Sequence, residues 1–187
     1  MLKHMLEYYF DEKRTAVFVD GANLWHTAGA MRFTVDFRLF KEFFAEYFDL
    51  VRIYYYTAIQ EDPGGHQQLR SLVDWLSFNE YALVTKMAKT YRSLGTERIK
   101  GNMDVEIAVD IVRMAPKLDV IILFSGDGDF CAAVKAAQDQ GARVFVVSTI
   151  TTQPPMVADE LRKQADGFID LSELVQRIRR SADVAKR

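Results

Sequence analysis

The sequence predicts an α/β fold, with a mostly parallel sheet covered by helices on both of its faces. Short apolar runs that suit strands alternate along the chain with longer segments of helical periodicity. This alternation is typical of parallel sheets, because two parallel strands are joined by a crossover helix that then covers one face of the sheet. The length of 187 residues and the apolar content of 49% suit one domain with a full hydrophobic core.

Each predicted strand is rich in Val, Ile, Phe and Tyr, the residues that favour β-structure. These strands are expected near residues 15–19, 51–57, 81–86, 119–124 and 143–148, with a weaker sixth near 168–171. Helices are expected near residues 36–48, 65–78, 103–115, 130–140, 156–164 and 172–180. Gly141 suits the position just after a helix, whereas Pro154 and Pro155 can only begin one.

The chain shows no interdomain linker, internal repeat or low-complexity stretch, so a single domain is predicted. Its expected limits are residues 14–180, with an N-terminal extension at 1–13 and a C-terminal tail at 181–187. The extension carries the aromatic residues Tyr8, Tyr9 and Phe10. Their rings are expected to pack on the body of the domain or on a second copy of the chain, which would form a homodimer.

Composition narrows the class of protein and its partners. The net charge is −2, so a nucleic-acid partner must be held by a local basic patch. No apolar run approaches the roughly 20 residues that span a bilayer, and the charged N-terminus does not resemble a signal peptide. The single cysteine, Cys131, rules out a disulfide within the chain. A cytoplasmic protein without a membrane partner is therefore expected.

Aspartates follow two of the predicted strands directly. Asp20 ends the run Ala16 to Val19, and Asp127 and Asp129 follow Val120 to Phe124. The carboxyl ends of parallel strands meet at one edge of a sheet, where α/β proteins bind ligands. Carboxylates gathered there repel one another unless protons or cations neutralise them, and oxygen ligands favour hard ions. The expected ion is Mg²⁺ or Mn²⁺.

The helix near 103–115 adds a fourth carboxylate. At about 100° per residue, Asp104 shares a stripe with Ala108 and Ile111 that should face the sheet. Asp110 falls on the other side with Arg113 and is predicted to face solvent. Asp104 is therefore included in the predicted site and Asp110 is left out of it.

Each of these acidic residues also has a purely structural interpretation. Asp104 could cap its helix, and Asp-Gly pairs are common in turns that lead from a strand to a helix. Asn23 could cap a helix beginning near Leu24. The metal site is favoured because carboxylates are expected at three separate strand ends, so that three such structural explanations would have to hold independently.

Three motifs in the chain resemble those of the NYN domain, in particular its bacterial LabA-like branch within the PIN-like nuclease superfamily. They are Val17 to Leu24 (VFVDGANL), Lys100 to Val105 (KGNMDV) and Phe124 to Phe130 (FSGDGDF), in the family's order, and the resemblance runs from about Arg14 to Leu174. Met103 stands where Val is commoner, an apolar exchange that leaves Asp104 unaffected.

The resemblance implies a Rossmann-like three-layer α/β/α sandwich of PIN-like type and a Mg²⁺ or Mn²⁺ centre that cuts RNA phosphodiesters. It implies that four aspartates are both metal ligands and catalytic residues, and that Asn23 is a polar active-site residue. The four are Asp20, Asp104, Asp127 and Asp129.

The stretch from Lys86 to Lys100 is the candidate surface for substrate. It holds five basic residues against the single acid Glu97 and leads into the helix of Asp104. Arg92, Arg98 and Lys100 are predicted to contact RNA phosphates, which supply most non-specific affinity for nucleic acids. The alternative is a solvated loop. Two serines that follow strand ends are further candidates for phosphate binding, Ser125 and Ser148.

The predicted function is that of a metal-dependent endoribonuclease, which hydrolyses RNA with a water activated by the divalent ion. A small-molecule phosphohydrolase could use the same carboxylates, although Ala22 removes the Asp-x-Asp pattern of the haloacid-dehalogenase style. A non-catalytic RNA-binding or regulatory module would keep the fold and the basic stretch. Metal-dependent shortening of RNA distinguishes the first from the other two.

Overall fold

A computed structural model of the chain describes residues 12–59, 67–93 and 96–181, and for residues 67, 89–93 and 96–100 it describes the backbone alone. Nearly all of the predicted N-terminal extension, with its aromatic residues, and of the C-terminal tail lies outside the described residues. Among the residues described, no helix is both long enough and apolar enough to cross a membrane.

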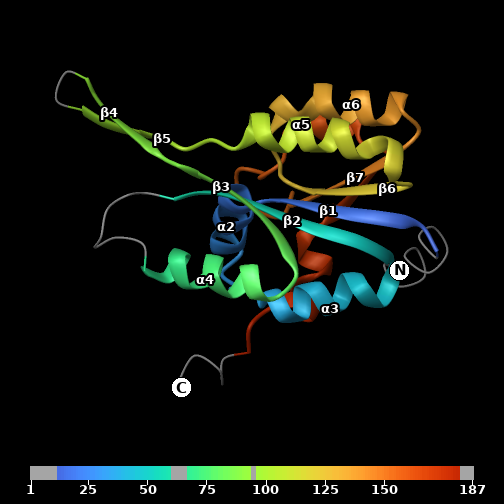
Figure 1. The fold of residues 1–187 in the computed structure, drawn as a ribbon, viewed down its shortest axis with the longest axis horizontal. Helices are drawn as coiled ribbons and strands as arrows, with labels where there is room; N and C mark the ends of the chain where they lie inside the picture. The colour runs from blue at the N-terminus through green and yellow to red at the C-terminus, as the bar shows by residue number, and fades with distance from the viewer. Residues whose placement is uncertain (1–11, 60–66, 94–95, 182–187) are drawn as a thin grey trace.

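Six parallel strands form the central sheet, in the order β3-β2-β1-β6-β7-β8 (Figure 1). Their bounds are β1 Arg14–Asp20, β2 Asp49–Ile59, β3 Tyr81–Met87, β6 Val120–Phe124, β7 Arg143–Ser148 and β8 Gly167–Asp170. The predicted strands near 51–57 and 143–148 agree closely with β2 and β7. The all-parallel sheet confirms the predicted fold class.

Helices cover both faces of this sheet and complete three layers (Figure 1). One face carries α2 Gly21–Ala30, α3 Phe37–Tyr47 and α4 Gln67–Phe78. The other carries α5 Asp104–Met114 and α6 Cys131–Asp139. Shorter segments are α7 Asp159–Gln164, α8 Val175–Ile178 and the 3₁₀ turns Ala115–Lys117, Gly128–Phe130 and Leu171–Glu173. Contacts join α7 to α6 and α8 to α3.

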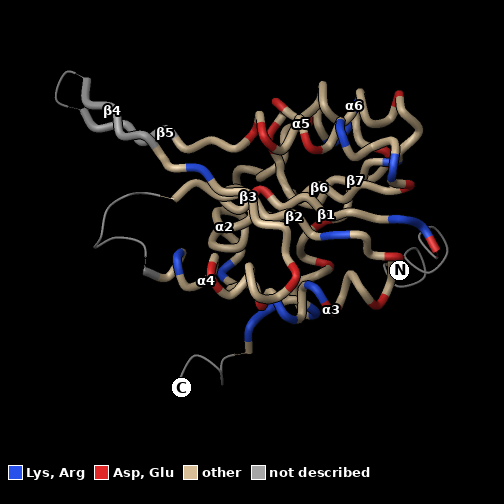
Figure 2. Tube along the Cα trace, viewed as in Figure 1, with Lys and Arg blue, Asp and Glu red and all other residues tan. Residues whose placement is uncertain are grey.

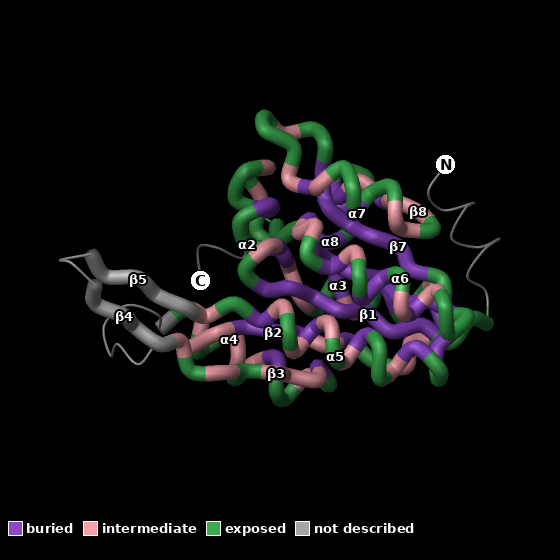
Figure 3. The backbone as a smooth tube through the Cα atoms, turned by 90° about the horizontal axis from the view of Figure 1, so that it is seen from above, coloured by how far each residue is buried: buried purple, intermediate pink, exposed green. Residues whose placement is uncertain are grey.

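Each face of the sheet packs its own apolar core. On β1, Val17 and Val19 belong to the core on the side of α3, whereas Ala16 and Phe18 belong to the core on the side of α5. This alternation follows from the two-residue period of a strand. Figure 3 shows β1 and β7 buried along almost their whole length, as expected for strands covered on both faces.

The structure differs from the sequence prediction in three elements. The helix α2 begins at Gly21 with Asp20 as its N-cap, so Asn23 is not the cap. The stretch after β3, where no strand was predicted, forms a two-stranded antiparallel hairpin, β4 Lys89–Ser93 and β5 Thr96–Lys100. Figure 1 shows this hairpin extending away from the body of the domain. The predicted helix near 172–180 is a 3₁₀ turn followed by the four residues of α8.

The direction of the strand order changes at β1. This strand pairs with β2 on one side and with β6 on the other. The connections that follow β1 and β6 therefore run in opposite directions across the sheet, which is the arrangement at which open α/β sheets bind ligands. The residues that follow β1 and β6 are brought together at this edge.

Candidate metal centre

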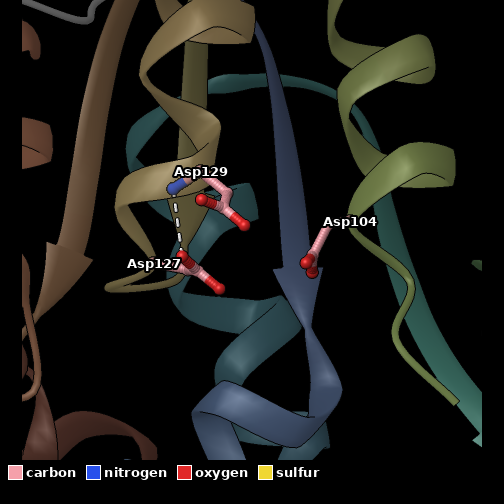
Figure 4. Close-up of side chains that lie close together, drawn as sticks. All are labelled: Asp104, Asp127 and Asp129. Atoms are coloured by element: carbon pink, nitrogen blue, oxygen red, sulfur yellow. Dashed lines mark hydrogen bonds between the residues drawn. The ribbon is translucent and has the colours of Figure 1, made fainter. Parts of the chain in front are cut away.

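Three carboxylates converge at this edge of the sheet. Asp104, Asp127 and Asp129 each offer a carboxylate oxygen, and these three oxygens lie within 4.8 Å of one another. Asp104 is the first residue of α5, whereas Asp127 and Asp129 lie in the turn between β6 and α6. Figure 4 shows the two groups of side chains facing each other beside the carboxyl end of β1. Oxygen-only ligands at this separation are suited to a hard divalent cation.

A tight turn positions the two aspartates that follow β6. The Oδ1 of Asp127 accepts a hydrogen bond from the backbone N–H of Asp129 at 3.0 Å, which caps the short 3₁₀ segment. Just before it, Gly126 lies so close to Met156 that a Cβ on residue 126 would come 1.7 Å from the Met156 carbonyl oxygen. The Ala158 N–H also donates to the Gly126 carbonyl at 2.8 Å. The segment after β7 thus supports the acidic turn from behind.

Asn102 holds the third carboxylate and was missed as a site residue from the sequence. Its Oδ1 accepts a hydrogen bond from the backbone N–H of Asp104 at 2.6 Å, and its Nδ2 donates back to the Asp104 carboxylate. Because asparagine often bonds to the backbone two residues later, the Asn-x-Asp spacing carried a signal for this turn. The turn fixes Asp104 at the start of its helix.

Asp20 lies beside the three carboxylates but is not one of the group. Its side chain is turned toward the protein, where Oδ1 accepts from the Asn23 N–H at 3.1 Å and Oδ2 accepts from the Ser125 hydroxyl at 3.2 Å. Burial raises the pKa of the Asp20 carboxyl, the Asn23 N–H opposes this, and the negative charge of Asp104 raises the pKa further. In this arrangement Asp20 joins the end of β1 to the end of β6.

Asn23 and Ser125 belong to the same internal network. The Asn23 Oδ1 accepts the backbone N–H of Gly126 at 3.2 Å, and the fully buried Ser125 hydroxyl accepts the N–H of Asp127 at 3.3 Å. Both side chains therefore hold the acidic turn in place through its backbone. Ser125, predicted as a phosphate ligand, has its hydroxyl engaged with Asp20 in this structure.

The electrostatics of the cluster favour a bound cation. Burial raises the pKa of the Asp104 carboxyl, hydrogen bonding to Asn102 lowers it, and the charges of Asp127 and Asp129 raise it again. Lys86 is the described cation that counteracts this effect, and its Nζ donates to Glu106 at 2.9 and 3.0 Å. Figure 2 shows acidic positions at the start of α5. Like charges held this close are stabilised when a proton or a metal ion joins them.

Of the remaining predicted substrate residues, Ser148 is hydrogen-bonded inside the protein and three lie outside the described side chains. The Ser148 hydroxyl is buried and donates to the Met156 carbonyl at 2.9 Å. Arg92 lies on β4, and Arg98 and Lys100 lie on β5. Their side chains are outside the described part of the chain, so their role stays a prediction.

The prediction that Asp110 faces solvent is wrong. The Asp110 Oδ2 accepts a hydrogen bond from the buried Tyr56 hydroxyl at 2.9 Å, and its side chain is only 16% exposed. The buried residues Ile107 and Ile111 place the centre of the packed face between them, roughly 40° from the direction assumed for Asp104. Asp104 and Asp110 therefore flank this face on opposite sides, and Asp104 lies on the side of Asp127 and Asp129.

Comparison with known proteins decides the family. The family model described as the NYN domain matches residues 14–173. The chain belongs to the NYN domain family. NYN domains are a PIN-like nuclease family, so the family and the acidic cluster point to the same class of chemistry.

Two relatives and one solved structure are similar to this NYN chain over most of its length. It is 34% identical over 170 residues to the low amplitude and bright protein LabA of Synechococcus elongatus, covering 88% of this chain and 87% of that protein. It is 26% identical over 182 residues to an uncharacterized protein of Methanocaldococcus jannaschii, covering 94% of this chain but only 62% of that longer relative. A crystal structure of a protein of unknown function from Vibrio parahaemolyticus superposes with a TM-score of 0.69 at 26% identity, covering 86% and 93% of the two chains.

Proposed function

We propose that this NYN domain is an endoribonuclease that hydrolyses RNA phosphodiester bonds with Mg²⁺ or Mn²⁺ held by Asp104, Asp127 and Asp129. The observation that supports this most is the convergence of three carboxylates from two separate elements at the carboxyl edge of a parallel sheet. Family membership supports it independently, because NYN domains are typically nucleases.

The three side chains fit a small divalent cation. Ligand oxygens lie about 2.1 Å from Mg²⁺, so two oxygens on opposite sides of the ion are about 4.2 Å apart. The oxygens of the cluster lie within 4.8 Å of one another, a separation that small side-chain rotations bring into this range. Asp129 is exposed and Asp104 is half-buried, so water and substrate have access to the same place.

The chain's own residues would hold the ion and fix its position relative to the strand of RNA. When bound, the ion lowers the pKa of a water molecule and neutralises charge on the phosphate. Asp104, Asp127 and Asp129 are the proposed ligands. Asp20 and Asn23 are proposed to position them, because their hydrogen bonds reach Ser125 and Gly126 in the connection that carries Asp127.

A gel assay on single-stranded RNA tests this function. The purified protein should shorten the RNA with Mg²⁺ or Mn²⁺ and leave it intact with a chelator. Asp127→Asn should lower the cleavage rate by about two orders of magnitude or more, the scale expected when electrostatic stabilisation of a transition state is lost. Asp139→Asn is the matched control, because Asp139 is an exposed aspartate on α6 that pairs only with Lys135 in the described structure.

Other outcomes of the assay would contradict the proposal. Equal rates for Asp127→Asn and Asp139→Asn would remove Asp127 from the centre. RNA that is retained by the protein but never cut would instead indicate a non-catalytic binding module, and turnover of small phosphate esters alone would indicate a phosphohydrolase.

A further inference from the structure

Two aromatic side chains are strongly exposed among the described residues, and they lie at opposite edges of the sheet. Trp25 on α2 is 72% exposed, and Phe78 at the end of α4 is 87% exposed. Phe78 is followed by the turn into β3, so it lies at the amino edge of the strands. Trp25 belongs to α2, whose N-cap is Asp20 at the end of β1, so it lies at the carboxyl edge with the acidic cluster.

Trp25 is close to the proposed centre along its helix. It is five residues beyond the N-cap Asp20, which corresponds to about 7.5 Å along the helix axis. Side chains on a helix lean toward its N-terminus, so the indole covers the turn nearer the cluster. Asp20 in turn lies near enough to Asp104 for the two charges to interact. The indole is thus within a few nucleotides of a phosphodiester bound at the cluster.

The neighbours of Trp25 one helical turn away on α2 are small. One turn before it is Ala22, which is exposed, and one turn after it is Gly29, where an added Cβ would meet nothing within 4 Å. The ring contact recorded for Trp25 is an edge-on one with the neighbouring His26, at 5.0 Å between centroids and 78° between planes. With most of its surface in water, the indole adds little to the core of the domain.

We infer that Trp25 stacks on an unpaired base of the RNA strand that is bound at the Asp104–Asp127–Asp129 centre, an inference that rests on the proposed function. An uncharged aromatic ring suits the base and not the phosphate, because the surrounding carboxylates repel phosphate away from the metal. Stacking of this kind accepts any base, since every base has a π-face. The residue would hold the strand in register without selecting its sequence.

Binding of RNA can be measured apart from cleavage. In the Asp127→Asn background with Mg²⁺, where cleavage is expected to be slow, the strand stays intact during the measurement, and fluorescence anisotropy of labelled single-stranded RNA gives the affinity. Trp25→Ala should weaken binding by roughly 5- to 150-fold, the equivalent of about 1–3 kcal/mol per stacked base. Phe78→Ala, which removes an even more exposed ring at the far edge, should leave affinity unchanged. The salt dependence should be the same in all three proteins, because no phosphate contact is lost.

Intrinsic fluorescence gives a second measurement. The chain has two tryptophans, and Trp75 packs against the core, so Trp75→Phe leaves Trp25 as the sole indole. RNA should quench this emission strongly, whereas RNA of the same length and charge with abasic sites should quench it little. A Trp25→Ala protein with wild-type affinity, equal quenching by abasic RNA, or no RNA binding by the wild type would each overturn the inference.

The two proposals can fail separately. A protein that binds RNA through Trp25 but does not cut it with Mg²⁺ or Mn²⁺ would overturn the nuclease function and leave the stacking contact in place. A protein that cuts RNA and binds it equally well without the indole would do the reverse.

Discussion

The environment of Asp110 on α5 is set by Tyr56, a residue of β2 that is distant in the sequence. Its carboxylate accepts from Tyr56, which is fully buried, and pairs with Arg113 three residues later on α5. Burial, and then the charge of Asp110, raise the pKa of the Tyr56 hydroxyl well above its ordinary value. The hydroxyl therefore stays protonated and acts as the donor to Asp110.

Asp110→Ala should consequently destabilise the fold by about 1–3 kcal/mol, because it leaves the buried Tyr56 hydroxyl without its acceptor. Metal-dependent cleavage should be unaffected. Urea unfolding followed by circular dichroism measures the change. In a Tyr56→Phe background the same substitution should cost much less, since no buried hydroxyl remains to be satisfied. An effect within about 0.5 kcal/mol in the wild-type background would show that the hydrogen bond is unimportant.

For single residues, the sequence predicted the three clustered carboxylates better than the hydrogen bonds that position them. Asp104, Asp127 and Asp129 were predicted from their places after strands and on a helix stripe, and they do converge. Asp20 was expected to join them. Its two oxygens are instead satisfied by the Asn23 N–H and by Ser125, a partner 105 residues later that no local pattern reveals.

The turn between β6 and α6 has no room for a side chain at Gly126. Gly126→Ala would put a methyl group against the Met156 carbonyl, where the backbone must shift to accommodate it. We expect a loss of several kcal/mol in stability, or a protein that does not accumulate in folded form. Gly29→Ala is the matched control within a helix, because a Cβ there meets nothing.

The control substitution should stabilise the protein by roughly 0.5–1 kcal/mol, the usual gain of Ala over Gly in a helix. Thermal melts of the two variants measure both effects. A Gly126→Ala protein as stable as the wild type would mean that the Met156 segment does not press on the acidic turn.

The β4–β5 hairpin is the element whose contact with RNA can be tested by mutation. Its register pairs Lys89 with Lys100 and Tyr91 with Arg98. If the hairpin contacts RNA phosphates, Arg92→Ala with Arg98→Ala should weaken binding of all RNA sequences. Each lost contact should flatten the plot of log K against log salt by roughly 0.7 for a single strand. Affinity and slope that both match the wild type would identify the hairpin as a solvated connection.

The strands of the sheet were predictable from the sequence because they are buried. The strands of the core are apolar on both faces, as β6 shows by being fully buried, and such runs stand out. The hairpin was missed because its strands pair only with each other and carry charged residues at half of their positions, so apolar periodicity gives no signal. A longer helix was predicted near residues 172–180, where Leu171, Leu174 and Ile178 keep helical spacing. In the structure a 3₁₀ turn precedes a helix of only four residues.

For the whole molecule, the acidic edge predicts a dependence of stability on pH that a metal removes. Asp20 and Asp104 have raised pKa values, so in the absence of metal the folded protein retains protons at pH values where the unfolded chain, with carboxyls near 3.8, has lost them. The contribution of these groups to stability is therefore greatest below that value and is lost as the pH rises through their raised pKa values.

Urea midpoints measured in chelator at about pH 4 and about pH 7 test this, with Asp104→Asn as the comparison. The wild type should lose more stability than the variant between the two conditions, and added Mg²⁺ should remove that difference, because a cation stabilises the ionised carboxylates. Identical pH profiles for the two proteins would show that Asp104 carries no strain from like charges.

The order of the strands also has a consequence for the growing chain on the ribosome. A nascent polypeptide that has emerged only as far as β3 contains Asp20 but none of the three cluster carboxylates, and its β1 still lacks the neighbour β6. Domains fold as units once their long-range pairings can form, so the acidic edge is assembled only after residue 129 has left the exit tunnel. Until then the chain carries no assembled acidic cluster beside the messenger RNA that encodes it.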